Sequence, residues 1–325
     1  MQELMIEAVL IAIYAIGVGT ISSMVGIGGG IFNTPLLLIV FLLSEQFAPA
    51  TALVAALFLA VASSIAYWRQ DPRPIIPRVG LFLAITTVPG SLIGVTLRTM
   101  IQSPYVLRVI FGLALMPVAI RMLFAVKREK GDIASELAEY DMSNLTDKRL
   151  AISLFGGFIG GISAGLLGIG GGAVVVPVLS VLMGLPMHAA VATSMFTMMF
   201  TASAGTAMNY IQGYINPYYA IALGAGMLIG AQFGSRFASK VNSVQLKRIF
   251  GVILVYPLVR MMKLGQLWLD PASFFDPLVN QNILMSTIGD LTIWLVIVVP
   301  IGLFRLYQLR TQQAASMEPS ETSSE

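Results

Sequence analysis

Apolar stretches, most of them long enough to cross a bilayer, recur along almost the whole chain. They lie at 5–25, 31–43, 49–68, 78–99, 104–126, 150–168, 172–184, 188–210, 217–238, 245–263 and 283–304. A spanning helix needs about 20 such residues. The chain is 57% hydrophobic and 11% charged, whereas a soluble domain is about 25% charged. The sequence therefore predicts an all-α integral membrane protein.

A glycine break occurs twice, each time inside an apolar run. Residues 24–30 read MVGIGGG and residues 166–172 read LLGIGGG. The apolar stretches that follow, 31–43 and 172–184, hold about 13 residues each and cover only about 20 Å of a core about 30 Å thick. We expect each to be a half-helix in a re-entrant or broken hairpin, which enters the membrane, turns at the glycines and leaves on the side it came from.

The two breaks belong to an internal repeat with a spacing of 142 positions from Gly26 to Gly168. The same shift places Pro35 on Pro177, and the tripeptide IFG at 110–112 recurs at 249–251. The predicted organisation has five parts: a first transmembrane repeat, a charged cytoplasmic linker, a second repeat, an outer loop with a final transmembrane helix, and a polar disordered tail. They cover 1–126, 127–149, 150–264, 265–310 and 311–325.

The basic residues predict the orientation. With the N-terminus outside and the C-terminus cytoplasmic, 15 of the 19 Lys and Arg residues fall on the inner side, as the positive-inside rule requires. One hairpin plus three crossings is an odd number of crossings, so the second repeat is inverted relative to the first. We expect a multi-pass protein of the cell inner membrane.

Inverted repeats with interrupted helices are typical of secondary transporters, whose sites lie near the midplane between the repeats. A helix that begins there presents unpaired N–H groups and a partial positive charge, and such an end binds anions. Close helix packing is the alternative reason for the glycines.

Hydroxyl and amide side chains complete the predicted lining of the site. Thr193, Thr197 and Thr201 share one helical face, which we expect to face the breaks. The substrate-binding candidates are Gly28, Gly29, Gly30, Asn33, Ser63, Gly170, Gly171, Gly172, Thr193, Ser194, Thr197, Ser203 and Asn209.

Fixed charges are scarce in the predicted core. His188 is placed in a turn at the inner surface, as a loop residue rather than a proton relay. Arg98 and Arg108 flank an outer loop, where surface anchoring is the expected role and attraction of anions is the alternative. Asp290 lies within the last span, where a carboxylate is costly and often functional; a structural role for it stays equally open.

The doubled GIGGG, followed by NTPLLL and VVPVLS, together with AVATSMF and FGVILVYPLVRMM, resembles the TauE/SafE family of sulfite and organosulfonate exporters over about residues 5–263. The resemblance implies a carrier of small sulfur-containing anions, with both glycine triplets as its paired motif. The two copies differ, because Ala52 occupies the position that Ser194 has in the second.

The predicted function is export of sulfite, sulfoacetate or a related organosulfonate by alternating access. The expected partners are a small anion and the lipid bilayer, with no nucleic acid and no cofactor, and a homo-oligomer stays open. An anion channel, or an importer of another small carboxylate or oxyanion, is the alternative. An enzyme is disfavoured, since one His and no Cys provide no catalytic or metal cluster.

Overall fold

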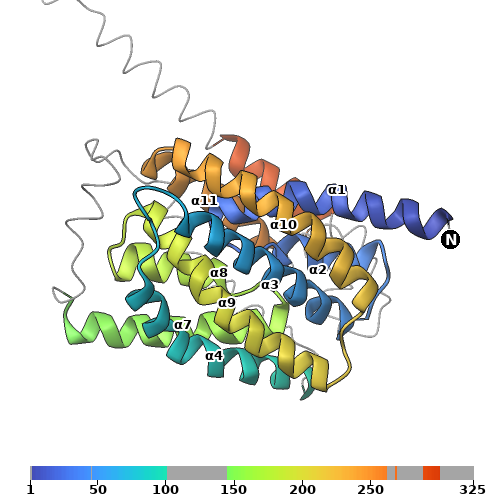
Figure 1. The fold of residues 1–325 in the computed structure, drawn as a ribbon, viewed down its shortest axis with the longest axis horizontal. Coiled ribbons are helices and arrows are strands. Elements are labelled where there is room, and N and C mark those ends of the chain that lie inside the picture. The colour runs from blue at the N-terminus through green and yellow to red at the C-terminus, as the bar shows by residue number, and fades with distance from the viewer. Residues whose placement is uncertain (1, 45, 101–144, 262–267, 269–287, 301–325) are drawn as a thin grey trace, which may run out of the picture. The chain divides into compact units, whose positions relative to one another are not determined.

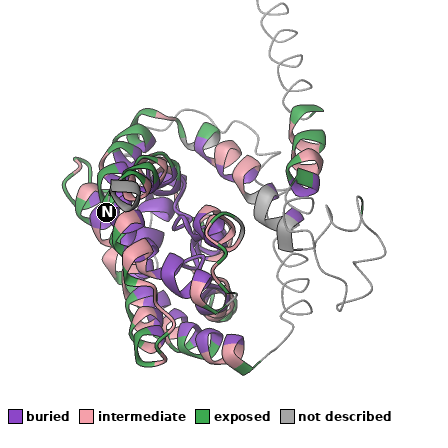
Figure 2. Ribbon diagram, turned by 90° about the vertical axis from the view of Figure 1, so that its right-hand side faces the viewer, coloured by how far each residue is buried: buried purple, intermediate pink, exposed green. Residues whose placement is uncertain are grey.

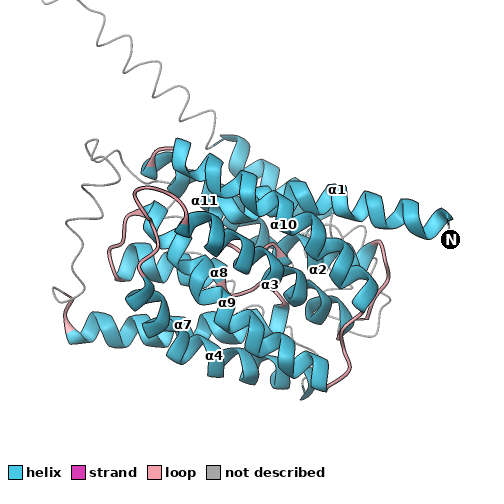
Figure 3. Cartoon of the chain, viewed as in Figure 1, coloured by secondary structure: helices cyan, strands magenta, loops and turns pink. Residues whose placement is uncertain are grey.

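The computed structural model describes residues 2–44, 46–100, 145–261, 268 and 288–300. Every regular element in those ranges is a helix (Figure 3), as predicted. Four helices have the length and composition of membrane spans: Ile6–Val25, Phe47–Trp68, Pro77–Met100 and Asp147–Leu167. The chain divides into two compact units, Met1–Leu254 and Val255–Glu325.

Both glycine breaks interrupt a helix where the sequence predicts. Helix α1 (Gln2–Val25) is followed by the short α2 (Gly30–Ile39), and α7 (Asp147–Leu167) is followed by α8 (Gly172–Pro177), which continues as the π-helix η2 (Val178–Leu182). The backbone φ is positive at three glycines in each break, with values of 70° to 92°: Gly26, Gly28, Gly29, Gly168, Gly170 and Gly171. Residues with a Cβ seldom adopt this conformation, so the glycines fix both the position and the shape of the breaks.

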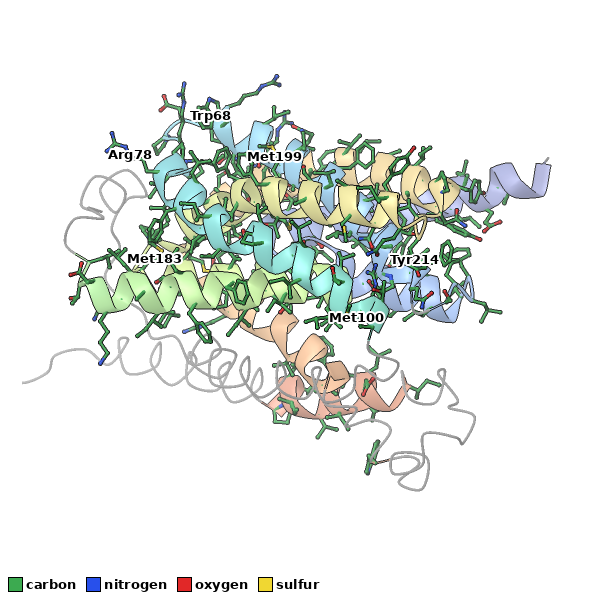
Figure 4. The ribbon with its side chains drawn as sticks, turned by 90° about the horizontal axis from the view of Figure 1, so that it is seen from below. Trp68, Arg78, Met100, Met183, Met199 and Tyr214 are labelled. Atoms are coloured by element: carbon green, nitrogen blue, oxygen red, sulfur yellow. The ribbon has the colours of Figure 1, made fainter. Side chains whose placement is uncertain are left out.

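Long helices follow each short one. They are α3 (Phe47–Trp68) and α4 (Pro77–Met100) after the first break, and α9 (Met187–Ile211), α10 (Pro217–Lys240) and α11 (Ser243–Met261) after the second. Figure 4 shows α4 running from the end of the bundle where Trp68 and Arg78 lie to the end where Met100 and Tyr214 lie. In the second unit, the helix Ile288–Pro300 lies inside the predicted last span.

Two parallel helix pairs flank the centre of the first unit, α1 with α10 and α4 with α7 (Figure 1). Small residues let each pair approach closely. A Cβ on Gly230 would lie 3.0 Å from the carbonyl carbon of Gly19, and a Cβ on Gly90 would lie 3.2 Å from the Cα of Gly161. Contacts of this kind bring backbones together in membranes.

The outward faces of these helices carry large apolar side chains that are exposed in the isolated chain: Ile6, Val9, Leu10, Ile13, Ile85, Phe155, Ile221 and Phe237. Figure 2 shows the buried residues of the first unit gathered between the helices, with exposed residues on their outer sides. Apolar surface of this extent suits contact with lipid rather than water.

Several predicted segments fall outside the described residues. They are the span 104–126, most of the linker 127–149 and the tail 311–325, together with Arg108. The apolar stretch at 150–168 forms most of α7, which begins earlier, at Asp147, because the polar residues before Leu150 continue the helix.

Replacing Gly230 by alanine is expected to destabilise the protein. The new Cβ would collide with the carbonyl oxygen of Ile16 and lie 2.7 Å from the backbone nitrogen of Thr20. Over-packing of this kind costs about 1–3 kcal/mol, more than the roughly 1 kcal/mol that alanine gains over glycine in helix propensity. Thermal unfolding of the purified protein in detergent should show a lower Tm.

Gly17→Ala is the matched control, because nothing lies within 4 Å of a Cβ at Gly17 in the same helix pair. Its Tm should be equal to or above that of the wild type. A Tm for Gly230→Ala at or above wild type would contradict the close approach of α1 to α10.

Candidate functional site

The two glycine breaks are in direct backbone contact with each other, although they lie far apart in the sequence. A Cβ on Gly30 would collide with the carbonyl oxygen of Gly168 and lie 2.8 Å from the Cα of Ile169. A Cβ on Gly172 would collide with the carbonyl oxygen of Gly26 and lie 2.9 Å from the Cα of Ile27. The contact is reciprocal, and it confirms the expectation that the two breaks meet.

Met198, near the middle of α9, lies between the breaks. A Cβ on Gly28 would lie 2.6 Å from its sulfur, and a Cβ on Gly170 would lie 2.5 Å from the same atom. The sequence analysis did not single out Met198. A methionine in an apolar helix carries no local signal of such a position.

The amides at the start of each short helix form no hydrogen bond to the part of the chain that the structure describes. The first backbone hydrogen bonds after each break are donated by Phe32 and Asn33 to the carbonyl of Gly29, and by Val174 and Val175 to that of Gly171. Eight amides, those of residues 28–31 and 170–173, donate to no acceptor among the described residues. All eight residues are buried. Because buried N–H groups usually have a partner, these amides can bind an acceptor that the described residues do not supply.

Unpaired polar atoms border the first break. The Ser22 hydroxyl and the Asn33 side-chain oxygen are both buried and have no hydrogen-bond partner. A Cβ on Gly29 would lie 3.4 Å from the Ser22 oxygen, and the Asn33 amide nitrogen lies 3.6 Å from the sulfur of Met227. These groups can supply or reorient hydrogen bonds beside the open amides.

Two hydroxyls hold the breaks against their neighbours. Ser194 donates to the carbonyl of Gly26 at 3.3 Å, and Thr34 donates to that of Leu167 at 3.1 Å. Of the α9 polar residues predicted from the sequence, Ser194 therefore contacts a break directly.

The threonines of α9 face α4 instead of the breaks, which corrects the sequence expectation. Thr193 accepts from the amide of Ile76 at 3.0 Å, Thr197 donates to the carbonyl of Gly80 at 3.2 Å, and the hydroxyls of Thr201 and Thr87 are 2.7 Å apart. Helical spacing identified the shared face but could not say which neighbour it meets.

Two other predicted residues lie elsewhere. The Ser63 hydroxyl donates to the Ser23 hydroxyl at 2.9 Å, and the Ser23 hydroxyl donates to the carbonyl of Ala231 at 3.1 Å. These two hydrogen bonds link α3, α1 and α10. Ser203 is exposed, and its hydroxyl donates to the carbonyl of Met199 at 2.6 Å within its own helix.

The sequence prediction of a surface arginine at 98 is wrong. Arg98 is only 7% exposed; it donates to the carbonyl of Gly165 at 3.2 Å and to the side-chain oxygen of Asn209. Its place depends on contacts with α7 and α9, which spacing within α4 does not reveal. Asn209, a predicted site residue, is thus joined to a buried charge.

His188 was expected in a surface turn, but it is buried in the first turn of α9. Its Nε2 lies 3.1 Å and 2.7 Å from the carbonyl oxygens of Ala238 and Val241, at the end of α10. Asp290, in the second unit, is also buried. No cluster of three or more His, Cys, Asp or Glu side chains suited to a metal ion occurs among the described residues.

Comparisons with known proteins identify the family of the chain. Residues 11–261 match the family model described as sulfite exporter TauE/SafE. The chain is 28% identical to "Probable membrane transporter protein YunE" of Bacillus subtilis strain 168, over 76% of this chain and 94% of that protein. It is 27% identical to a "Probable membrane transporter protein" of Xylella fastidiosa strain Temecula1, over 77% and 93%. No solved structure gives a significant match.

Thr201→Val tests whether the threonine row stabilises the α4–α9 contact. The change leaves the buried Thr87 hydroxyl without its partner at 2.7 Å, which costs about 1–3 kcal/mol. We expect a lower Tm in detergent. Ser203→Ala is the control on the same helix; because Ser203 is exposed, its Tm should equal the wild-type value. Equal stability of the two variants would contradict the row's structural role.

Proposed function

We propose that this chain, which belongs to the TauE/SafE sulfite exporter family, carries small sulfur-containing anions past the paired glycine breaks. It is a multi-pass membrane transporter rather than an enzyme. The substrates are sulfite, sulfoacetate or related organosulfonates. The observation that carries the proposal is the set of eight buried amides without an acceptor, gathered where the two breaks touch.

Electrostatics favour an anion at this place. Helices α2 and α8 both begin at the contact, and neither has an acidic residue in its first turn. The N-terminal end of a helix carries a partial positive charge, so two such ends in contact repel each other unless a negative ligand lies between or beside them. A sulfonate offers three acceptor oxygens and one charge, which suits a site with many neutral donors.

Two inverted repeats that rock against each other would supply alternating access. The reciprocal contacts of Gly30 with Gly168 and of Gly172 with Gly26 support this architecture, as do the matching parallel pairs α1 with α10 and α7 with α4. In such a scheme the breaks lie at the boundary between the moving parts.

The protein is proposed to lie in the cell inner membrane, with its N-terminus outside and its C-terminus in the cytoplasm. The connection between α3 and α4 carries Arg69 and Arg73, and positive loops stay inside. Gln212–Asn216, which joins α9 to α10 at the opposite end, carries no charge. Net export then follows the outward gradient of the anion.

Transport into proteoliposomes tests the proposal. We expect saturable uptake of labelled sulfite and sulfoacetate, with countertransport between them, and weaker uptake of sulfate, acetate and taurine. Unsaturable flux without countertransport would indicate an anion channel and overturn the carrier mechanism. Uptake of taurine alone, or of acetate in preference to both sulfur anions, would overturn the proposed substrate class.

Gly29→Ala tests the site itself. A Cβ at Gly29 would collide only with the flexible end of Met227, so the fold should persist, but the methyl group and the strain at φ 73° would disturb the open amides. We expect the KM for sulfite to rise about tenfold, as for the loss of one or two hydrogen bonds to a charged group.

Gly213→Ala is the matched control. Its φ of 75° imposes the same backbone strain, and nothing lies within 4 Å of its Cβ. Its KM should equal the wild-type value. If both variants kept wild-type kinetics, the first break would not be part of the anion site.

A further inference from the structure

Arg98 is a buried positive charge near one end of the bundle. It lies in the last turn of α4, two residues before Met100, which Figure 4 places at the same end as Tyr214. Only 7% of its surface is exposed. Burying an arginine among apolar helices is costly, and such residues usually pair with an acid or face a substrate pathway.

Among the described residues, the groups that bind this guanidinium are neutral. Nη1 donates to the carbonyl of Gly165 at 3.2 Å and Nη2 donates to Asn209 Oδ1. Asn209 is fixed in turn, since its amide nitrogen donates to the carbonyl of Gly205 at 2.8 Å. No carboxylate among the described residues forms an ion pair with Arg98, and its buried Nε has no hydrogen-bond partner. The described residues therefore orient this charge without neutralising it.

The charge lies beside the second glycine break. Gly165 is three residues before Gly168, the first glycine of that break, in the last turn of α7. At the first break the corresponding carbonyl is that of Ser23, three residues before Gly26, and it accepts a hydrogen bond from the neutral hydroxyl of Tyr67 at 2.9 Å. The carbonyl before the second break is thus bound by the cation of Arg98, and the equivalent carbonyl before the first break is bound by the neutral phenol of Tyr67.

We propose that Arg98, oriented by Asn209, is a binding station for the transported oxyanion on the α4 side of the second break, with the free Nε–H as a donor to the anion. The inference rests on the proposed anion transport and adds to it a charged group that the glycine motif does not contain. An oxyanion at this station would neutralise the guanidinium and lie near the Gly165 carbonyl, in the last turn of α7 before the second break.

The experiment compares wild type, Arg98→Gln, Arg98→Lys and Asn209→Asp, in proteoliposome uptake of labelled sulfite and in sulfite-induced thermal stabilisation in detergent. Arg98→Gln should raise the KM about tenfold or more, since a charge-assisted hydrogen bond is lost, and should reduce the rise in Tm at a given sulfite concentration. Arg98→Lys keeps the positive charge but lacks the planar guanidinium. Its KM should therefore lie between that of the wild type and that of Arg98→Gln.

Asn209→Asp separates binding from folding. The new carboxylate would pair with Arg98 and occupy the positive charge, so the KM should rise about tenfold while the Tm without sulfite stays at or above wild type. Arg78→Gln is the control, because Arg78 is exposed at the opposite end of α4; its KM should be unchanged.

Two results would overturn the inference. One is a lower Tm for Arg98→Gln with an unchanged KM and an intact sulfite-induced shift, which would mean that Arg98 only caps the end of α7. The other is a wild-type KM for Asn209→Asp. Failure of the proposed function is distinguishable from both, because wild-type liposomes would then move none of the sulfur anions.

Discussion

The arrangement around the candidate site depends on the contact of one glycine-rich backbone with another. Where Gly30 meets Gly168 and Gly172 meets Gly26, only a hydrogen atom fits between main chains. Two helices can therefore end against each other in the middle of an apolar bundle, and their unbonded amides collect in one small volume. Because the positive φ values and the close approach both exclude a side chain, the same residues provide the turn and the space.

The sequence predicted features that are encoded locally. Glycine lowers the cost of a left-handed turn wherever it stands, so the two breaks, the short helices after them and the bounds of most long helices could be read from the chain itself. Ser194 and Asn209 were identified as polar residues in an apolar helix, and both have polar contacts of consequence.

Features that depend on which helices become neighbours could not be predicted. Thr193, Thr197 and Thr201 share a face by helical geometry. That face meets Ile76, just before α4, and Gly80 and Thr87 within α4, each of which forms a hydrogen bond with one of the threonines. Arg98 looked like a surface anchor because it stands near the end of a span. It is buried because α7 and α9 pack beside it, where the Gly165 carbonyl and the Asn209 side-chain oxygen accept its hydrogen bonds. Each of these outcomes is decided by a second helix.

The pairing of helices also sets an order for biosynthesis. The contact between α4 and α7 joins residues 67 positions apart, as between Arg98 and Gly165, whereas the contact between α1 and α10 joins residues 208 apart, as between Ser23 and Ala231. At about 5–20 residues per second, the ribosome needs about 10–40 s to make the chain that separates them. During that interval α1 has no α10 to pack against, so the small residues that α10 later contacts face lipid or other parts of the nascent chain.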